Sequence, residues 1–310
     1  MRYRVYAGFV APDYCGAAVK PDTYEGYRRE VVAFLSWARA RGHRLTSINL
    51  IDYYLCAYLH FIHGTRGKGA CSRALSGMAH FRPECRGRLG CSSLAMRGIN
   101  RMQPGKQANP VAWHIAVLIA WFLSRVFGFR YGVATVVAGH CLLRVGELIR
   151  IRTTDVVERG DDRFGCTNPT MVIRLSKTKA GRVQSVSVDN PDVERLIIVL
   201  LRCTKAGGRL FPFSDDKFRR VMAVACQRLG LRMHFTPHGL RHGGATEHWM
   251  RLRNLALLCL RGRWANEKSC LNYLQEGEMA YVAQHVIPSH LRQLALVFVT
   301  DIFGTLSQTH

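Results

Sequence analysis

The stretch TPHGLRHGGAT, residues 236–246, brings His238, Arg241 and His242 together and contains no carboxylate. A planar guanidinium can bind a phosphate through two parallel hydrogen bonds, and a neighbouring imidazole can move a proton to or from it. Because the stretch holds no counter-ion for these donors, we expect their anionic partner to be a phosphate that belongs to a substrate.

Two other routes to phosphate chemistry are disfavoured by the sequence. A metal-dependent nuclease needs clustered carboxylates, and the paired aspartates at 161–162 and 215–216 fall in a predicted turn and at a predicted helix start. A nucleotide-driven enzyme needs a glycine-rich phosphate loop with a lysine, which neither AGGRLF nor HGTRGKG provides. Arginine, histidine, lysine and tyrosine remain, and these can stabilise a five-coordinate phosphate and attack it covalently. We therefore expect no cofactor and no metal.

The chain is basic along its whole length. Its 310 residues include 44 Lys and Arg against 21 Asp and Glu, a net charge of +23. Residues 1–105 hold 16 of the basic and 6 of the acidic side chains, so the excess is not confined to one tail. This charge favours a polyanionic partner, with nucleic acid ahead of an anionic membrane surface, and the high share of arginine suits phosphate contacts.

The eleven cysteines indicate an intracellular, reducing compartment, because they contain no CxxC pair and no disulfide pattern. No signal peptide is visible, and the most apolar stretch, 111–123, is too short to span a bilayer. We expect a nuclear protein if the source is eukaryotic, a cytoplasmic one otherwise, and no membrane partner. One local group has a spacing that fits no zinc site: Cys71, His80, Cys85 and Cys91.

The elements that must position these side chains begin with helices. Apolar periodicity and capping residues predict helices over 21–42, 47–62 and 92–102, which form a small basic bundle. The segment 103–111 contains two prolines and a glycine, and we place a domain boundary within it, so that the first domain covers 1–105.

A second domain, 106–285, mixes helices with a small sheet. We expect helices over 109–125, 128–142, 191–204 and 214–229, the last capped by Ser214 and ended by Gly230. Branched residues alternate with polar ones over 171–188, which predicts an antiparallel hairpin that turns near Ala180 and Gly181. An apolar-striped tail, 286–310, completes a mainly α fold with a small antiparallel β-sheet, an α+β class; it could pack on its own domain or on a second protomer.

From residue 109 to 280 the sequence resembles the catalytic domain of the tyrosine recombinases, the phage-integrase family. That family carries an arginine in an LR..EL context, a lysine on a β-hairpin, a His-x-x-Arg box, a histidine or tryptophan, and then a tyrosine. The same order and spacing occur here, in LLRVGEL, LSKTKAG, PHGLRH, RGRW and CLNYLQ, at Arg144, Lys177, His238, Arg241, Trp264 and Tyr273.

The resemblance is looser over 20–103, which is similar to the SAM-like core-binding bundle that precedes catalysis in this family. Leu143 stands where many members have glycine. The sequence LRHGGAT is more similar to recombinases of eukaryotic mobile elements, including DIRS-like elements, than to bacterial chromosome-resolution enzymes.

The resemblance implies that the two arginines of this pattern bind one phosphodiester. Arg144 could instead simply pair with Glu147 one turn on; in the catalytic interpretation that carboxylate orients the guanidinium. Arg241 would add a second planar fork on the non-bridging oxygens. His238 would handle protons, while His242, next to the box, is expected to support the fold.

The remaining roles have rivals nearby. Lys177, the implied general acid for the departing 5′ oxygen, competes with Lys179, because strand alternation puts both on one face. Trp264 would donate its indole N–H to the phosphate. Tyr273 is the implied nucleophile, and Tyr281 is disfavoured by its spacing from the tryptophan.

The resemblance thus implies a DNA recombinase or integrase that works through a 3′-phosphotyrosyl intermediate, without ATP, on double-stranded DNA rather than a small molecule, as a homotetramer on two sites. Two alternatives keep the fold. One is a type IB topoisomerase-like enzyme that reseals the strand it cut, and the other is a catalytically degenerate relative that only holds DNA. A generic basic helical RNA-binding protein would leave the ordered set to chance.

Overall fold

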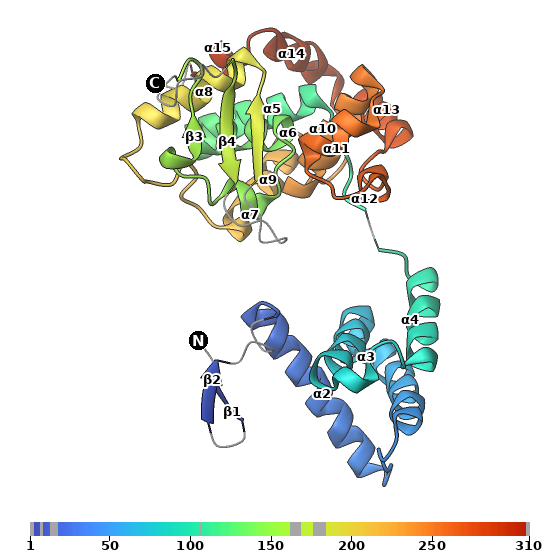
Figure 1. Ribbon diagram of the computed structural model, residues 1–310. Coiled ribbons are helices and arrows are strands. Elements are labelled where there is room, and N and C mark those ends of the chain that lie inside the picture. Colours follow the sequence, from blue (N-terminus) through green and yellow to red (C-terminus); the bar gives the residue numbers. More distant parts are fainter. Residues whose placement is uncertain are drawn as a thin grey trace. The chain divides into compact units, whose positions relative to one another are not determined.

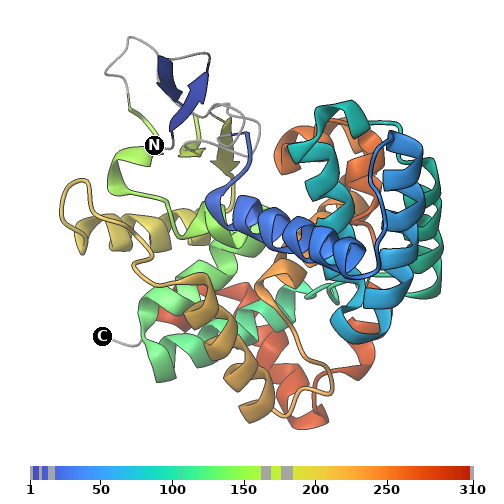
Figure 2. The same ribbon diagram turned by 90° about the horizontal axis from the view of Figure 1, so that it is seen from below.

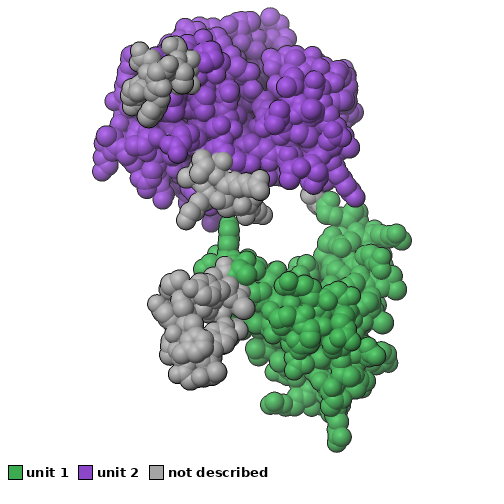
Figure 3. Space-filling view, viewed as in Figure 1, with its two compact units in different colours: residues 1–106 green, residues 107–310 purple. Residues whose placement is uncertain are grey.

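The computed structural model describes residues 18–105, 107–161, 169–175 and 184–307, together with the backbone of 3–6 and 9–12. The chain divides into two compact units, Met1–Lys106 and Gln107–His310 (Figure 3). Within the described ranges, none of the helices combines the length and the apolar character needed to cross a membrane.

Unit 1 is built around two long helices (Figures 1 and 2). Helix α2, Pro21–Ala40, packs across α3, Ile48–Phe81, and α4, Gly90–Met102, packs on α3 in turn. A short 3-10 turn, Pro83–Cys85, joins the last two helices. Two N-terminal strands, Tyr3–Tyr6 and Phe9–Pro12, pair antiparallel; the sequence had predicted no strand there.

The start of α3 is fixed by Ser47, whose hydroxyl accepts the N–H of Leu50 at 3.3 Å. The predicted end at residue 62 is wrong, because the helix runs on to Phe81 across a kink at Gly67, where φ is 72°. Glycine tolerates this left-handed angle.

Unit 2 is a helical body with one small sheet (Figure 1). Helices α5, Trp113–Phe127, and α6, Phe129–His140, form its centre, because both bury most of their residues. The remaining helices are α7 Val145–Leu148, α8 Pro191–Arg202, α9 Asp215–Arg228, α10 Pro237–Leu252, α11 Leu255–Gly262, α12 Glu267–Leu271, α13 Glu276–His285, α14 Ser289–Thr300 and α15 Ile302–Ser307.

The sheet has the order β3-β4-β5 and is antiparallel throughout. Its strands are β3 Val156–Val157, β4 Met171–Leu175 and β5 Gln184–Val188. Alternate residues of β4 and β5 are buried in the core that α5 and α6 share, which confirms the predicted hairpin. The expected turn near Ala180 and Gly181 lies outside the described residues.

The C-terminal helices belong to unit 2. Trp121 of α5 and Phe298 of α14 pack with ring centroids 5.2 Å apart. The backbone N–H of Ile302, which opens α15, donates to Asp192 Oδ2 at 3.0 Å. Of the two arrangements open for the tail, the structure shows packing on the chain's own core over the described residues 286–307.

Helix α10 lies unusually close to the backbone of its neighbours. A Cβ added to Gly243 would lie 1.9 Å from the carbonyl oxygen of Val111, and one added to Gly244 would lie 2.2 Å from that of Gly139. The GGAT sequence is thus explained by packing, since only glycine lets α10 approach α6 and the residues before α5 this closely. This close packing of α10 fixes the position of His238 and Arg241.

Candidate active site

The described members of the predicted set meet in one cluster. Arg144 is the N-cap residue of α7, while His238 and Arg241 lie near the start of α10. Trp264 follows the end of α11, and Tyr273 lies in the turn after α12. Helices α10, α11 and α12 follow one another and lie side by side, which brings His238, Arg241, Trp264 and Tyr273 together (Figure 1).

Arg241 is at the centre of this cluster and is fully buried. Its Nη1 donates to the carbonyl oxygen of Leu142, and its Nη2 donates to that of Gly262 at 2.7 Å. Its guanidinium carbon lies 4.7 Å from the ring centre of Trp264 and 5.1 Å from that of Tyr273. Two carbonyl groups and two aromatic faces therefore hold the guanidinium in place.

Glu147 is the carboxylate that three arginines share. Its oxygens lie 2.6 Å from Nη1 of Arg144, 3.1 Å from Nη2 of Arg263 and 3.9 Å from Nη1 of Arg241. Burial alone would raise the pKa of Glu147, but the backbone N–H of Arg144 and the charge of Arg263 outweigh it and lower the pKa. The expected Arg144–Glu147 pair forms, as both interpretations of Arg144 require.

Three guanidinium groups around one carboxylate leave the cluster with an excess of positive charge. Burial, with the like charges of Arg144 and Arg263, lowers the pKa of Arg241 to about 10, so the group stays protonated at neutral pH. This excess of positive charge favours the binding of an anion.

The two expected arginine forks differ in access. The side chain of Arg144 is 36% exposed, whereas that of Arg241 is 0% exposed. The Arg241 Nε and the indole Nε1 of Trp264 are also buried, and neither has a hydrogen-bond partner among the described residues. In this conformation Arg144 alone of the two arginines is open to a phosphate, so contact with Arg241 requires the surrounding side chains to move.

Arg263 was missed by the sequence analysis. Its side chain is 3% exposed, and it donates to Glu147 Oε2 and to the carbonyl oxygen of Leu142, at 3.1 and 3.0 Å. Its backbone is left-handed, with φ of 57°. The only signal in the sequence was its place in RGRW, directly before Trp264.

The Tyr273 ring is surrounded by the other predicted groups. Its centroid lies 5.6 Å from that of His238, 4.6 Å from that of His242 and 4.8 Å from that of Trp264. The hydroxyl of Thr246 donates to its backbone carbonyl at 3.2 Å. Tyr281 lies instead on α13, 52% exposed and stacked on His285, so of the two candidate tyrosines Tyr273 is the one that lies in the cluster.

The two histidines of the box differ in surroundings. Desolvation and the positive charges of Arg241 and Arg144 lower the pKa of His238, which leaves an exposed, neutral imidazole beside the tyrosine. His242 is buried, and burial together with its neighbour His238 lowers its pKa to about 4. A neutral His238 can accept a proton, while His242 fills the space under the Tyr273 ring.

The predicted lysine falls outside the described residues, as does its rival: Lys177 and Lys179 both lie in 176–183, between β4 and β5. Within the described ranges, no group of three or more His, Cys, Asp or Glu side chains could hold a metal ion. Of the cysteine group singled out above, Cys71 and Cys85 are buried in the core of unit 1.

No protein-family model matches this chain, and no curated protein matches it. Several solved structures match it. The Tn1549 transposon integrase, in complex with circular intermediate DNA, is 15% identical with a TM-score of 0.59, covering 83% of this chain and 90% of that one.

Two further structures show the same likeness. The XerH site-specific recombinase, bound to a palindromic difH substrate, is 14% identical with a TM-score of 0.58, covering 91% of this chain and 80% of its own. A lambda integrase dimer bound to a core site is 15% identical with a TM-score of 0.54, covering 84% and 90%. At these identities the likeness is one of fold, and this chain has the fold of the tyrosine recombinases and integrases.

Proposed function

We propose that this chain is a site-specific DNA recombinase or integrase that cuts and rejoins strands through a 3′-phosphotyrosyl intermediate. One observation carries the proposal: the Tyr273 ring lies against Arg241, His238 and Trp264, and Glu147 links Arg241 to the more exposed guanidinium of Arg144. A nucleophile, a proton acceptor and cationic groups are thereby gathered around one position where a phosphate can bind.

Double-stranded DNA is the proposed substrate. The net charge of +23 provides the phosphate contacts on which affinity for DNA mainly depends. The structural neighbours support the choice, since the integrase, the XerH recombinase and the lambda dimer were all determined with DNA. We further propose assembly of several protomers on two DNA sites, and a reducing compartment such as the nucleus or cytoplasm.

In the proposed reaction the Tyr273 oxygen attacks a backbone phosphorus. The bond between phosphorus and the 5′ oxygen breaks, leaving a 3′-phosphotyrosyl linkage and a 5′ hydroxyl. His238, which is neutral at pH 7, accepts the proton of the tyrosine hydroxyl. Lys177, by its resemblance to the family's hairpin lysine, donates a proton to the departing oxygen. A 5′ hydroxyl from a partner strand reverses these steps, so the bond energy is retained.

The arginines stabilise the charge that develops on the phosphate. Arg144 reaches the phosphate first because its side chain is exposed, while Glu147 holds it in orientation. Arg241 stays bound to the carbonyl groups of Leu142 and Gly262, and its Nε–H donates to the phosphate once the side chains that cover it move aside. Since these cations supply the positive charge at the phosphate, the proposed step uses neither metal nor ATP.

A trapping experiment tests the proposal without knowledge of the target sequence. The substrate is a library of DNA duplexes, each with a randomised segment that contains a nick. Cleavage beside the nick releases a short fragment, so the covalent intermediate cannot be resealed. We expect a protein–DNA adduct that survives denaturation, and we expect the trapped duplexes to share a defined sequence.

Two matched tyrosine variants identify the nucleophile. Tyr273→Phe should abolish the adduct, and Tyr281→Phe should leave it intact, because Tyr281 stacks on His285 away from the cluster. Absence of an adduct across the whole library, or an adduct that persists in Tyr273→Phe, would contradict the proposal.

A further inference from the structure

The segment Arg261–Trp264, at the C-terminal end of α11, contacts several residues of the candidate active site. The carbonyl oxygen of Gly262 accepts a hydrogen bond from Arg241, and Arg263 pairs with Glu147. Trp264 packs on both Arg241 and Tyr273. Three successive residues therefore support the catalytic groups, and a shift of this segment would move all of them.

Part of this support is held in a strained conformation. Among the described non-glycine residues, only Leu142, Arg253 and Arg263 have a positive φ, and two of these, Leu142 with 48° and Arg263 with 57°, belong to the cluster. The carbonyl of Leu142 accepts from Arg241 and from Arg263. Left-handed residues other than glycine persist only where their surroundings enforce them, so something must hold both chain segments.

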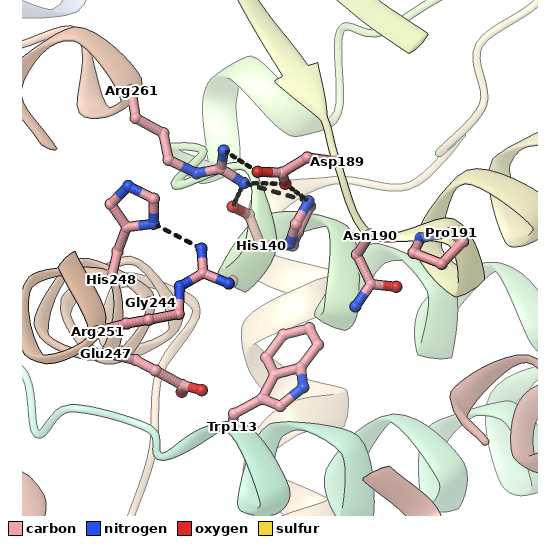
Figure 4. A pocket seen from close by; sticks show the side chains of 11 residues that line it. Trp113, His140, Asp189, Asn190, Pro191, Gly244, Glu247, His248, Arg251 and Arg261 are labelled. Carbon is pink, nitrogen blue, oxygen red and sulfur yellow. Dashed lines mark hydrogen bonds and ion pairs between the residues drawn. The ribbon is translucent and has the colours of Figure 1, made fainter. Parts of the chain in front are cut away.

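Arg261 provides that anchor from outside the cluster (Figure 4). Its Nη1 and Nη2 donate to the two oxygens of Asp189 at 3.0 and 2.8 Å, and Nη2 also donates to the carbonyl of His140 at 3.0 Å. The Nε2 of His140 lies 2.8 Å from the same carboxylate. His140 precedes Leu142 by two residues, and Arg261 precedes Arg263 by two, so one ion pair ties down both strained segments.

The arginine end of the anchor is buried. The Arg261 side chain is 12% exposed, against 43% for Asp189, and its guanidinium forms a bidentate pair, the stronger geometry for such bonds. The hydrogen bond from His140, with those from Arg261, holds the pKa of Asp189 well below its usual value, so the carboxylate stays charged. These groups line one wall of a cavity of about 240 Å³, whose other wall includes His248 and Arg251 of α10.

We propose that Asp189 and Arg261 are positioning residues, which hold the carbonyls of Leu142 and Gly262, and through them Arg241, in the arrangement that catalysis needs. Neither residue touches the phosphate in this scheme. The inference rests on the proposed function for its effect on rate, and on the structure alone for its effect on Arg241.

The first test measures the rate of adduct formation in a single turnover, with a nicked duplex recovered from the library. Asp189→Asn keeps the shape of the side chain and removes its charge. We expect the maximal rate to fall tenfold to about a hundredfold, the size of effect that a misplaced catalytic group produces. The DNA concentration that gives half of the maximal rate should stay within about twofold of the wild type.

The matched control is Asp301→Asn, because Asp301 Oδ1 accepts the N–H of Gly304 and caps α15 away from this segment. Its rate should equal that of the wild type. Arg261→Lys, which can satisfy only one of the two partners at a time, should give an intermediate rate. An Asp189→Asn rate equal to the control, or a loss expressed only in the half-saturating DNA concentration, would overturn the inference.

The second test needs no activity. The buried Nε–H groups of Arg241 and Arg263 should give slowly exchanging signals in nitrogen-15 spectra, assigned through single Lys substitutions. We expect Asp189→Asn to speed their exchange at least tenfold, and Asp301→Asn to leave it unchanged. Unaltered exchange in Asp189→Asn would refute the positioning role. If exchange is faster in Asp189→Asn but the wild type never forms an adduct, the positioning role would stand and the proposed function would be rejected.

Discussion

The replacement Glu147→Gln removes one negative charge from a cluster of three arginines while it keeps the side chain's size and one acceptor oxygen. The side chains of Arg241 and Arg263 are almost fully buried and close to this carboxylate, at 3.9 and 3.1 Å. Without the charge, both cations remain in the interior, and no other carboxylate of the described residues pairs with them.

The size of the effect follows from burial. Breaking a buried ion pair by removing one partner costs about 3–5 kcal/mol. Glutamine still accepts hydrogen bonds, so we expect a loss of roughly 2–3 kcal/mol in the free energy of unfolding of unit 2 at pH 7. The pair with the exposed Arg144 adds at most about 1 kcal/mol to that figure.

The loss should depend on pH in a defined direction. The pKa of Glu147 is lowered in the folded protein, so the unfolded chain takes up the proton first as the pH falls. Its contribution to stability is therefore complete above the unfolded pKa of about 4.3 and disappears as the pH falls through the lower folded value. Wild type and Glu147→Gln should converge in acid below about pH 4.

Urea unfolding followed by tryptophan fluorescence measures this, because four of the five tryptophans lie in unit 2. Glu278→Gln is the control, an exposed glutamate on α13 whose replacement should cost less than about 0.5 kcal/mol. A loss for Glu147→Gln no larger than that of the control at pH 7, or a difference that stays constant into acid, would refute the electrostatic account.

Two other outcomes follow from the packing around α10. Gly243→Ala would place a Cβ 1.9 Å from a backbone oxygen of Val111, so we expect urea unfolding to show a loss of at least about 2–3 kcal/mol, whereas Gly277→Ala, in open space on α13, should be neutral or gain up to about 1 kcal/mol. His242, with a pKa of about 4, should stay neutral in a nuclear magnetic resonance titration down to about pH 5. Its contribution to stability should be complete above about pH 6.5 and should fall as the pH drops towards 4. Titration of His242 near pH 6.5 would contradict its burial.

Local rules were enough to predict most of the elements. Ser214 caps α9 through the N–H of Lys217, and Gly230 ends the following turn with φ of 62°, as their positions in the sequence indicated. The hairpin of β4 and β5 followed from alternation alone. These features succeed because a cap, a stop or a pleat involves residues within a few positions of each other.

The sequence also determined which residues are candidates for chemistry, because their types and order are properties of the chain itself. Arg144, His238, Arg241, Trp264 and Tyr273 are brought together by helices that bury their other faces. The site of Lys177 stays a prediction.

Only the tertiary structure decided the environment of these groups. It shows that Arg241 is enclosed while Arg144 is open, that Arg263 completes the cluster, and that Arg261 and Asp189, 72 residues apart, meet behind it. Whether an arginine is buried and paired depends on which distant segments pack against each other. A basic chain has many arginines, and the sequence does not show which of them lie at such a contact. The packing of α10 against α6 and against the residues before α5, permitted by Gly244 and Gly243, determines which arginines lie in the cluster.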